Sequence, residues 1–189
     1  MSDSLAAKLA EVFGDRLKMV ATFGAHSHTC AIVDGITVDD LDKCATQFGK
    51  TRPAPLLMLV NELPRALDAF PLELNEIITT RRLVTGTDLL ATLTVSGEDL
   101  RRACEAQARG HLLHLREGYI ETAGDRKAVS ALVAASVAPF RALVANMARL
   151  DRTSAEELER RLGLATNDFP AALRAAERLV EYVDEWKTR

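Results

Sequence analysis

Apolar and polar positions follow two different periods along the first 95 residues, and together they predict a mixture of short helices and strands. Apolar residues that recur every three or four positions predict helices, whereas continuous or alternating apolar runs predict strands. The predicted helices are 5–13, 38–48 and 61–69, and the predicted strands are 17–23, 30–33, 56–60 and 72–78. Glycines follow several of these segments, as expected of turns. This part of the chain therefore has the pattern of an α/β domain with a small mixed sheet.

Two of the predicted strands differ in kind. The run LLMLV at 56–60 contains no polar residue, which is typical of a strand buried on both faces. The segment 72–78 alternates apolar with polar residues, which is typical of a half-exposed strand, and a turn is expected at Gly86. Between them, 61–69 is predicted as a helix with Asn61 as its cap and Pro64 in its first turns.

From residue 96 onward the period is helical throughout. One long helix is expected to run to a turn at 123–125, and an Ala- and Val-rich helix is expected over 126–150, interrupted or bent at Pro139. Two shorter helices follow at 153–162 and 168–187, the first with a Thr153-Ser-Ala-Glu capping box. We therefore predict an α+β protein, with an α/β domain at 1–95 and an antiparallel helical bundle at 96–189.

Composition and charge narrow the class of protein. The 189 residues are 48% apolar and 27% charged, which is sufficient for a packed core. The net charge is −3 and basic residues are interspersed with acidic ones, so the sequence carries no strong nucleic-acid signal. Cys30, Cys44 and Cys104 have no CxxC spacing and are expected to be reduced, mostly buried thiols. No stretch approaches the roughly 20 apolar residues of a spanning helix, so a cytoplasmic protein without a membrane partner is expected.

Three segments of the chain carry a family resemblance. They are VATFGA at 20–25, FPLELNEI at 70–77 and RGHLLHLREGY at 109–119. In this order they resemble a strand with its Gly-Ser turn, a third-carboxylate strand and a bundle helix of the nucleotidyltransferase-like proteins of the polymerase-beta superfold. The resemblance covers most of the chain, and it implies that Gly24 and Ala25 contact a nucleotide.

The metal-binding part of that family's site is missing. The family holds two divalent metals with an Asp-x-Asp pair and a third carboxylate, because the metals bridge the triphosphate and activate the acceptor. No such pair opens the second predicted strand, and Ala25 replaces the serine. One alignment deletes both aspartates and leaves a catalytically silent protein. The other alignment makes Asp34 the remaining member of the pair and Glu73 or Glu76 the third carboxylate. Under this alternative the protein would transfer a nucleotidyl group to a small hydroxyl- or amine-bearing acceptor, and only then is Mg²⁺ implied.

Two other constellations have candidate chemistry. His26, His28 and Cys30 alternate, so an extended chain would place them on one face, where zinc accepts such ligands. A fourth ligand is not visible, and solvent-exposed histidines in a polar turn are the favoured interpretation. Arg109 and His114 fit the Arg-x4-His pattern of helical-domain ribonucleases related to this bundle type, although five residues of helix separate them by about 140°.

The remaining candidates have plain structural alternatives. His111, His114 and Glu117 lie on one stripe of a helix, and this stripe either lines a pocket or faces solvent. Tyr182 and Trp186 are expected in the core or in a dimer contact. The basic stripe of the bundle has acidic residues three or four positions away, so a solvated face is favoured; its members are Arg101, Arg102, Arg109 and Arg116. The sequence thus favours a catalytically silent protein with a binding or regulatory role, whose partner is a nucleotide, a protein or a second copy.

Overall fold

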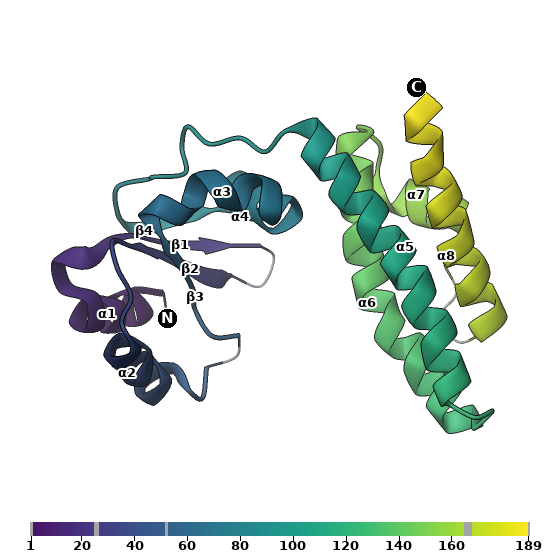
Figure 1. Cartoon of the computed structure of the whole chain (residues 1–189), viewed down its shortest axis with the longest axis horizontal. Helices are drawn as coiled ribbons and strands as arrows, with labels where there is room; N and C mark the ends of the chain where they lie inside the picture. The colour runs from purple at the N-terminus through teal and green to yellow at the C-terminus, as the bar shows by residue number, and fades with distance from the viewer. Residues whose placement is uncertain (1, 25–26, 52, 165–167, 189) are drawn as a thin grey trace. The chain divides into compact units, whose positions relative to one another are not determined.

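The polypeptide divides at Ser96–Gly97 into a mixed α/β unit and a helical unit (Figure 1). The computed structural model describes the whole chain except residues 1, 25–26, 52, 165–167 and 189. The fold class is α+β, with a small mixed sheet in the first unit and helices only in the second.

Four strands form the sheet, in the order β3-β2-β1-β4. They are β1 (Leu17–Phe23), β2 (His28–Val33), β3 (Leu56–Leu59) and β4 (Arg82–Gly86). β1 pairs antiparallel with both β2 and β4, whereas β2 pairs parallel with β3. Among the residues that the structure describes, β3 and β4 are therefore the two edges of the sheet.

Helices cover both faces of the sheet (Figure 1). They are α1 (Ser2–Phe13) and α2 (Val38–Phe48) on one face, and α3 (Leu63–Ala69) and α4 (Pro71–Thr80) on the other, with short 3-10 turns η1 (Gly14–Arg16) and η2 (Val60–Glu62). Side chains alternate between the faces, as a strand requires. Val20 and Ala31 pack in the α1 and α2 layer, whereas Met19, Ala21 and Ile32 pack in the α3 and α4 layer.

The sequence prediction for 72–78 was wrong, because this segment is the helix α4 and not a strand. Its apolar residues fit both periods. Leu72, Leu74 and Ile78 lie at even spacings, as in a strand, whereas Ile77 and Ile78 follow Leu74 by three and four positions, as in a helix. Pro71 occupies the first helical turn, where its missing N–H costs little. The strand that completes the sheet is β4, which lies just beyond, and Gly86 is its last residue with φ +86°.

The prediction for 56–60 was right about the strand and wrong about its surroundings. β3 is an edge strand, in which Leu56 is 41% exposed and only Met58 is buried. The helix predicted from Asn61 begins at Leu63, after the turn η2, and has Pro64 in its first turn. An apolar run of the kind found in the middle of a sheet therefore lies at its edge.

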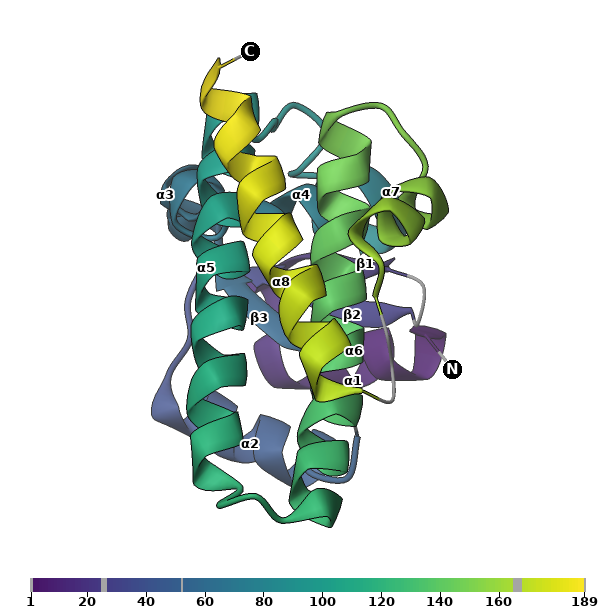
Figure 2. The same cartoon turned by 90° about the vertical axis from the view of Figure 1, so that its right-hand side faces the viewer.

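The second unit contains α5 (Gly97–Glu121), α6 (Arg126–Leu150), α7 (Ala155–Leu162), α8 (Phe169–Asp184) and the turn η3 (Glu185–Thr188). Two ion pairs fix the direction of α8 against α5. Arg109 pairs with Asp184, and Arg116, seven residues later, pairs with Glu177, seven residues earlier. α5 is thus antiparallel to α8, and Figure 2 shows α6 running alongside α8 in the same direction.

α6 is continuous through Pro139, so the proline does not interrupt it as the sequence suggested. By length and composition alone α6 is apolar enough to cross a membrane, which departs from the sequence expectation, and 22% of its most apolar stretch is buried. Phe140, Val144 and Met147 form its buried side, whereas Arg141 pairs with Glu159 at 2.9 Å. The residue that caps the start of α7 is Ser154 and not Thr153, because the side chain of Ser154 accepts a hydrogen bond from the backbone of Glu157.

Candidate functional site

The turn after β1, where the family resemblance expects a nucleotide, packs against the end of α4. Gly24 has φ +67°, a conformation that favours glycine. Its N–H donates a hydrogen bond to Oγ1 of Thr80 at 2.8 Å. A Cβ atom added at Gly24 would lie 3.1 Å from Oε1 of Glu76. Helix α4 thus holds the turn through one hydrogen bond and one close carboxylate.

These contacts oppose phosphate binding at Gly24. Phosphate-binding turns offer free backbone N–H groups to the anion. The N–H of Gly24 is already used by Thr80, and the carboxylate of Glu76 would repel a phosphate placed beside it. Ala25, the other predicted nucleotide contact, lies outside the described residues. The described part of the turn therefore has the geometry of a structural contact between β1 and α4.

The three candidate metal carboxylates do not form one site. Asp34 pairs with Lys18 at 2.7 Å, at the start of β1, whereas Glu76 lies beside Gly24, just past its end. Six residues of extended chain separate Lys18 from Gly24, which is about 20 Å at the usual rise per residue. Ligands of one magnesium ion each lie about 2 Å from it, so Asp34 and Glu76 cannot share a metal. Glu73 is exposed one helical turn before Glu76.

His28 and Cys30 lie on one face of β2, as their alternation predicts, but they do not form a metal site with described neighbours. His28 is half-buried, with its ring 5.6 Å from that of Phe23. Cys30 is 1% exposed, and burial raises its pKa to about 12. His26 lies outside the described residues, and among those that are described no three metal-binding side chains come together.

The two candidate ribonuclease residues, Arg109 and His114, have different environments. Arg109 is held by Glu105 at 3.0 Å and by Asp184 of α8, and the pKa of Arg109 is raised chiefly by its hydrogen bond to Glu105. The side chain of His114 is 82% exposed and lies 3.3 Å from Glu117. A guanidinium held by two carboxylates is poorly placed to bind phosphate. The structure does not bring Arg109 and His114 to one site.

The other candidates of the bundle have structural partners. His111 lies 5.5 Å from the ring of Phe140, and its pKa is lowered, first by burial and then by the nearby His114. Tyr182 is buried and, like Nε1 of Trp186 at 2.9 Å, donates a hydrogen bond to Asp151. Tyr182 therefore belongs to the core. In the basic stripe, Arg102, Arg109 and Arg116 all pair with carboxylates.

The first unit also contains an apolar cavity along β3. Its volume is about 710 Å³, within the range of sites that bind small ligands or side chains. The lining comes from β3, η2, α3 and the start of α4; it consists of Leu56, Leu57, Met58, Leu59, Asn61, Glu62, Arg65, Ala66, Ala69, Phe70, Glu73 and Leu74. Phe70 is 60% exposed at this cavity, so a large apolar ring faces solvent.

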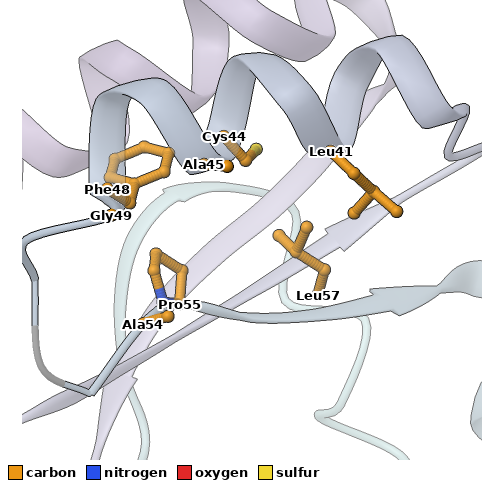
Figure 3. A pocket seen from close by; sticks show the side chains of 8 residues that line it. All are labelled: Leu41, Cys44, Ala45, Phe48, Gly49, Ala54, Pro55 and Leu57. Atoms are coloured by element: carbon orange, nitrogen blue, oxygen red, sulfur yellow. The ribbon is translucent and has the colours of Figure 1, made fainter.

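A second cavity lies on the other face of the same strand. Figure 3 shows α2 above the start of β3, with side chains of both facing the space between them. This cavity has a volume of about 210 Å³, and Leu41, Cys44, Phe48 and Pro55 are among its lining residues. Leu57 lines both cavities. The helices of both layers thus leave apolar space beside β3, where a further strand would continue the sheet.

The backbone of β3 also has an outward-facing side. The N–H of Leu59 donates to Oε2 of Glu62 at 2.9 Å, so it points away from β2. Successive residues of a strand direct their N–H and C=O groups to opposite sides, so those of Leu57 also point away from β2. Among the described strands, β3 has only β2 as a neighbour. The edge of the sheet at Leu57 is therefore open for backbone pairing.

No protein-family model matches the chain, and no curated protein matches its sequence. The sequence prediction did not anticipate the two cavities, although one signal was present: LLMLV is too apolar for an edge strand unless something covers it.

Proposed function

We propose that this protein is a catalytically silent, nucleotidyltransferase-like binding module that captures part of a partner protein beside β3. The apolar space on both faces of β3 is the observation that carries this proposal. Edge strands of soluble proteins are normally protected by charged residues, proline or bulges. Leu56 to Leu59 have none of these within the strand, and Leu56 and Phe70 remain exposed.

The arrangement of polar groups supports binding over catalysis. Asp34 lies at the opposite end of β1 from Glu76, and the N–H of Gly24 is bonded to Thr80. Two-metal nucleotidyl transfer needs clustered carboxylates, so the transferase alternative has less support. Ribonuclease chemistry would need Arg109 and His114 to converge on one phosphate, and Arg109 instead pairs with Asp184.

Calorimetry with ATP, GTP, CTP and UTP, with and without Mg²⁺, tests the non-catalytic part of the proposal. We expect no heat of binding for any of the four nucleotides, because the described Gly24 turn offers no free N–H to phosphate. The variant Glu76→Ala provides the decisive comparison. Magnesium-dependent binding by the natural chain that is lost in Glu76→Ala would contradict the proposal and restore the transferase alternative.

Site-specific photo-crosslinking tests the protein-binding part. A photoreactive phenylalanine analogue at Phe70, inside the larger cavity, is expected to form an adduct with one protein in the source cells. Purified, that protein should bind the natural chain and bind Leu56→Lys at least about tenfold more weakly. The matched control places the analogue at Leu83, which is 47% exposed on the opposite edge strand. Equal adduct formation from both positions would count against the proposal.

A further inference from the structure

We infer that the partner contributes an extended segment, apolar on both faces and carrying a basic residue, which pairs with β3 as a fifth strand. This inference rests on the proposed binding function and specifies the chemistry of the partner. It is carried by three independent properties of the β3 edge: its backbone, the two cavities beside it and the charges at the larger one.

The backbone sets where pairing begins. Leu57 directs its N–H and C=O away from β2, whereas the N–H of Leu59 is taken by Glu62. An added strand therefore exchanges its hydrogen bonds with Leu57 first. The carboxylate of Glu62 marks the end of the open edge, so the paired segment is short, about four or five residues, as β3 itself is.

The cavities set the side chains of the segment. A strand beside β3 projects alternate side chains into the α3 and α4 layer and into the α2 layer. The cavity on the first side is about 710 Å³ and that on the second about 210 Å³. Large apolar side chains therefore fit every second position, with smaller apolar side chains between them. An added strand with this pattern would fill the apolar space that the helices leave open on both faces of the sheet.

The charges at the larger cavity select a basic residue. Glu62 and Glu73 line it together with a single basic side chain, Arg65. Glu73 is exposed and has no ion pair with any described residue. In a cavity that is otherwise mostly apolar, a carboxylate attracts an opposite charge more strongly than it does in open solvent. A Lys or Arg of the partner beside Glu73 meets this requirement.

β4, at the opposite edge of the sheet, is protected against strand addition in ways that β3 is not. β4 begins with the exposed Arg82, its register of pairing with β1 shifts between Leu83 and Thr85, and it ends at Gly86 with φ +86°. Charges and irregularities of this kind protect an edge from further pairing. β3 consists of Leu56 to Leu59 without a charged residue. The two edges thus differ in the property that governs strand addition.

Selection from a displayed library of random short peptides, with the full chain as target, tests the inference. Enriched peptides are expected to share an apolar stretch with alternating large and small residues, next to Lys or Arg. A selected peptide should bind Leu56→Lys at least about tenfold more weakly than the natural chain, because a lysine there occupies the edge. Leu83→Lys, a matched change on the other edge strand, should bind the peptide as the natural chain does. Circular dichroism of both variants verifies folding.

Two further readouts separate strand pairing from apolar capture. Amide exchange at Leu57, followed by nuclear magnetic resonance, should slow on peptide binding, because its N–H becomes hydrogen-bonded to the added strand. Selection against Glu73→Lys should enrich acidic instead of basic residues. Unchanged exchange at Leu57, or an unchanged preference for basic residues, would overturn the respective part of the inference.

The remaining outcomes are also decisive. Failure to enrich any peptide, or equal binding to Leu56→Lys, overturns the inference but leaves the proposed function standing if crosslinks still form from Phe70. A dimer in sedimentation experiments that Leu56→Lys dissociates would identify a second copy as the occupant and overturn the partner-segment inference. Nucleotide binding lost in Glu76→Ala would instead contradict the proposed function itself.

Discussion

Asp40 is the one buried charged side chain among the residues that the structure describes, at 2% exposed. Both of its oxygens accept hydrogen bonds from Arg16, at 2.7 Å each, and it also accepts from the N–H and hydroxyl of Thr37 at 2.8 Å. The hydrogen bond from Arg16, more than any other contact, holds the pKa of Asp40 well below its usual range. A carboxyl whose pKa is lowered by folding stabilises the folded state only while it is ionised.

The stability of the first unit should therefore decrease at low pH. Above the unfolded pKa of about 4 the contribution of Asp40 is complete, and it is lost as the pH falls from there toward the lower folded pKa. We expect the melting temperature to fall as the pH is lowered below about 4, and to fall less steeply in Asp40→Asn, which should melt several degrees lower at pH 7. Asp39→Asn, next in the chain but exposed, is the control and should change little.

The three thiols are distinguished by burial. Cys30 and Cys104 are buried, which raises the pKa of each to about 12. Cys44 is only half-buried, in the wall of the smaller cavity, and burial raises its pKa as well. A thiol reagent at pH 8 should therefore modify Cys44 in the folded protein and the other two only after unfolding in guanidinium. Cys44→Ser should abolish the native reaction. Modification of two or three thiols in the folded protein would contradict the burial of Cys30 or Cys104.

At the scale of the element, most helices follow from local signals. Thr37 caps the start of α2, since its hydroxyl accepts from the N–H of Asp40 at 3.2 Å, and acidic residues occupy the first turn as predicted. Local signals did not correctly predict α4 or the position of β3 in the sheet, for different reasons. The apolar pattern of α4 fits two periods, and packing of Leu74 and Ile77 on the sheet chooses the helix. β3 has the composition of an inner strand, and only the strand order places it at the edge.

Pro139 supplies an element-scale prediction. It lies inside α6 on the exposed side, where it removes one backbone hydrogen bond to the carbonyl of Ala135. Pro139→Ala restores that donor, so we expect the unfolding free energy of the second unit to rise by about 2 kcal/mol, after allowance for the greater freedom of the unfolded chain. Chemical denaturation measures this change. Ala135→Gly, one turn earlier, should instead lower it by about 1 kcal/mol.

At the scale of the whole molecule, the two units have separate cores and separate optical probes. The single Trp and both Tyr residues lie after residue 96, so tyrosine and tryptophan fluorescence reports the second unit alone. Trp186 and Tyr182 both donate hydrogen bonds to Asp151, which joins the end of α6 to α8. Fluorescence of Trp186 therefore follows this junction, and labelling of the buried Cys30 follows the first unit.

These probes give a whole-molecule prediction. Asp151→Asn weakens two hydrogen bonds to a charged acceptor, so it should lower the unfolding free energy measured by Trp186 fluorescence by about 1–3 kcal/mol. Because each unit has its own hydrophobic clusters, the denaturant midpoint for Cys30 labelling should stay unchanged. Asp184→Asn, which removes an exposed partner of Arg109, should have a smaller effect on the fluorescence midpoint. A shift of both midpoints in Asp151→Asn would show that the units unfold together.

Local signals in the sequence were sufficient to predict the α+β class, the helical second half and most element positions, because turns, caps and periodicity act over a few residues. Which of the predicted site residues lie close together depends on the three-dimensional fold. Asp34 and Glu76 belong to opposite ends of β1, while Gly24 and Thr80, 56 positions apart in sequence, share a hydrogen bond. The strand order also places the apolar run LLMLV (56–60) at an open edge of the sheet, with a cavity on each face. Such pairings are non-local, so no short stretch of sequence specifies them.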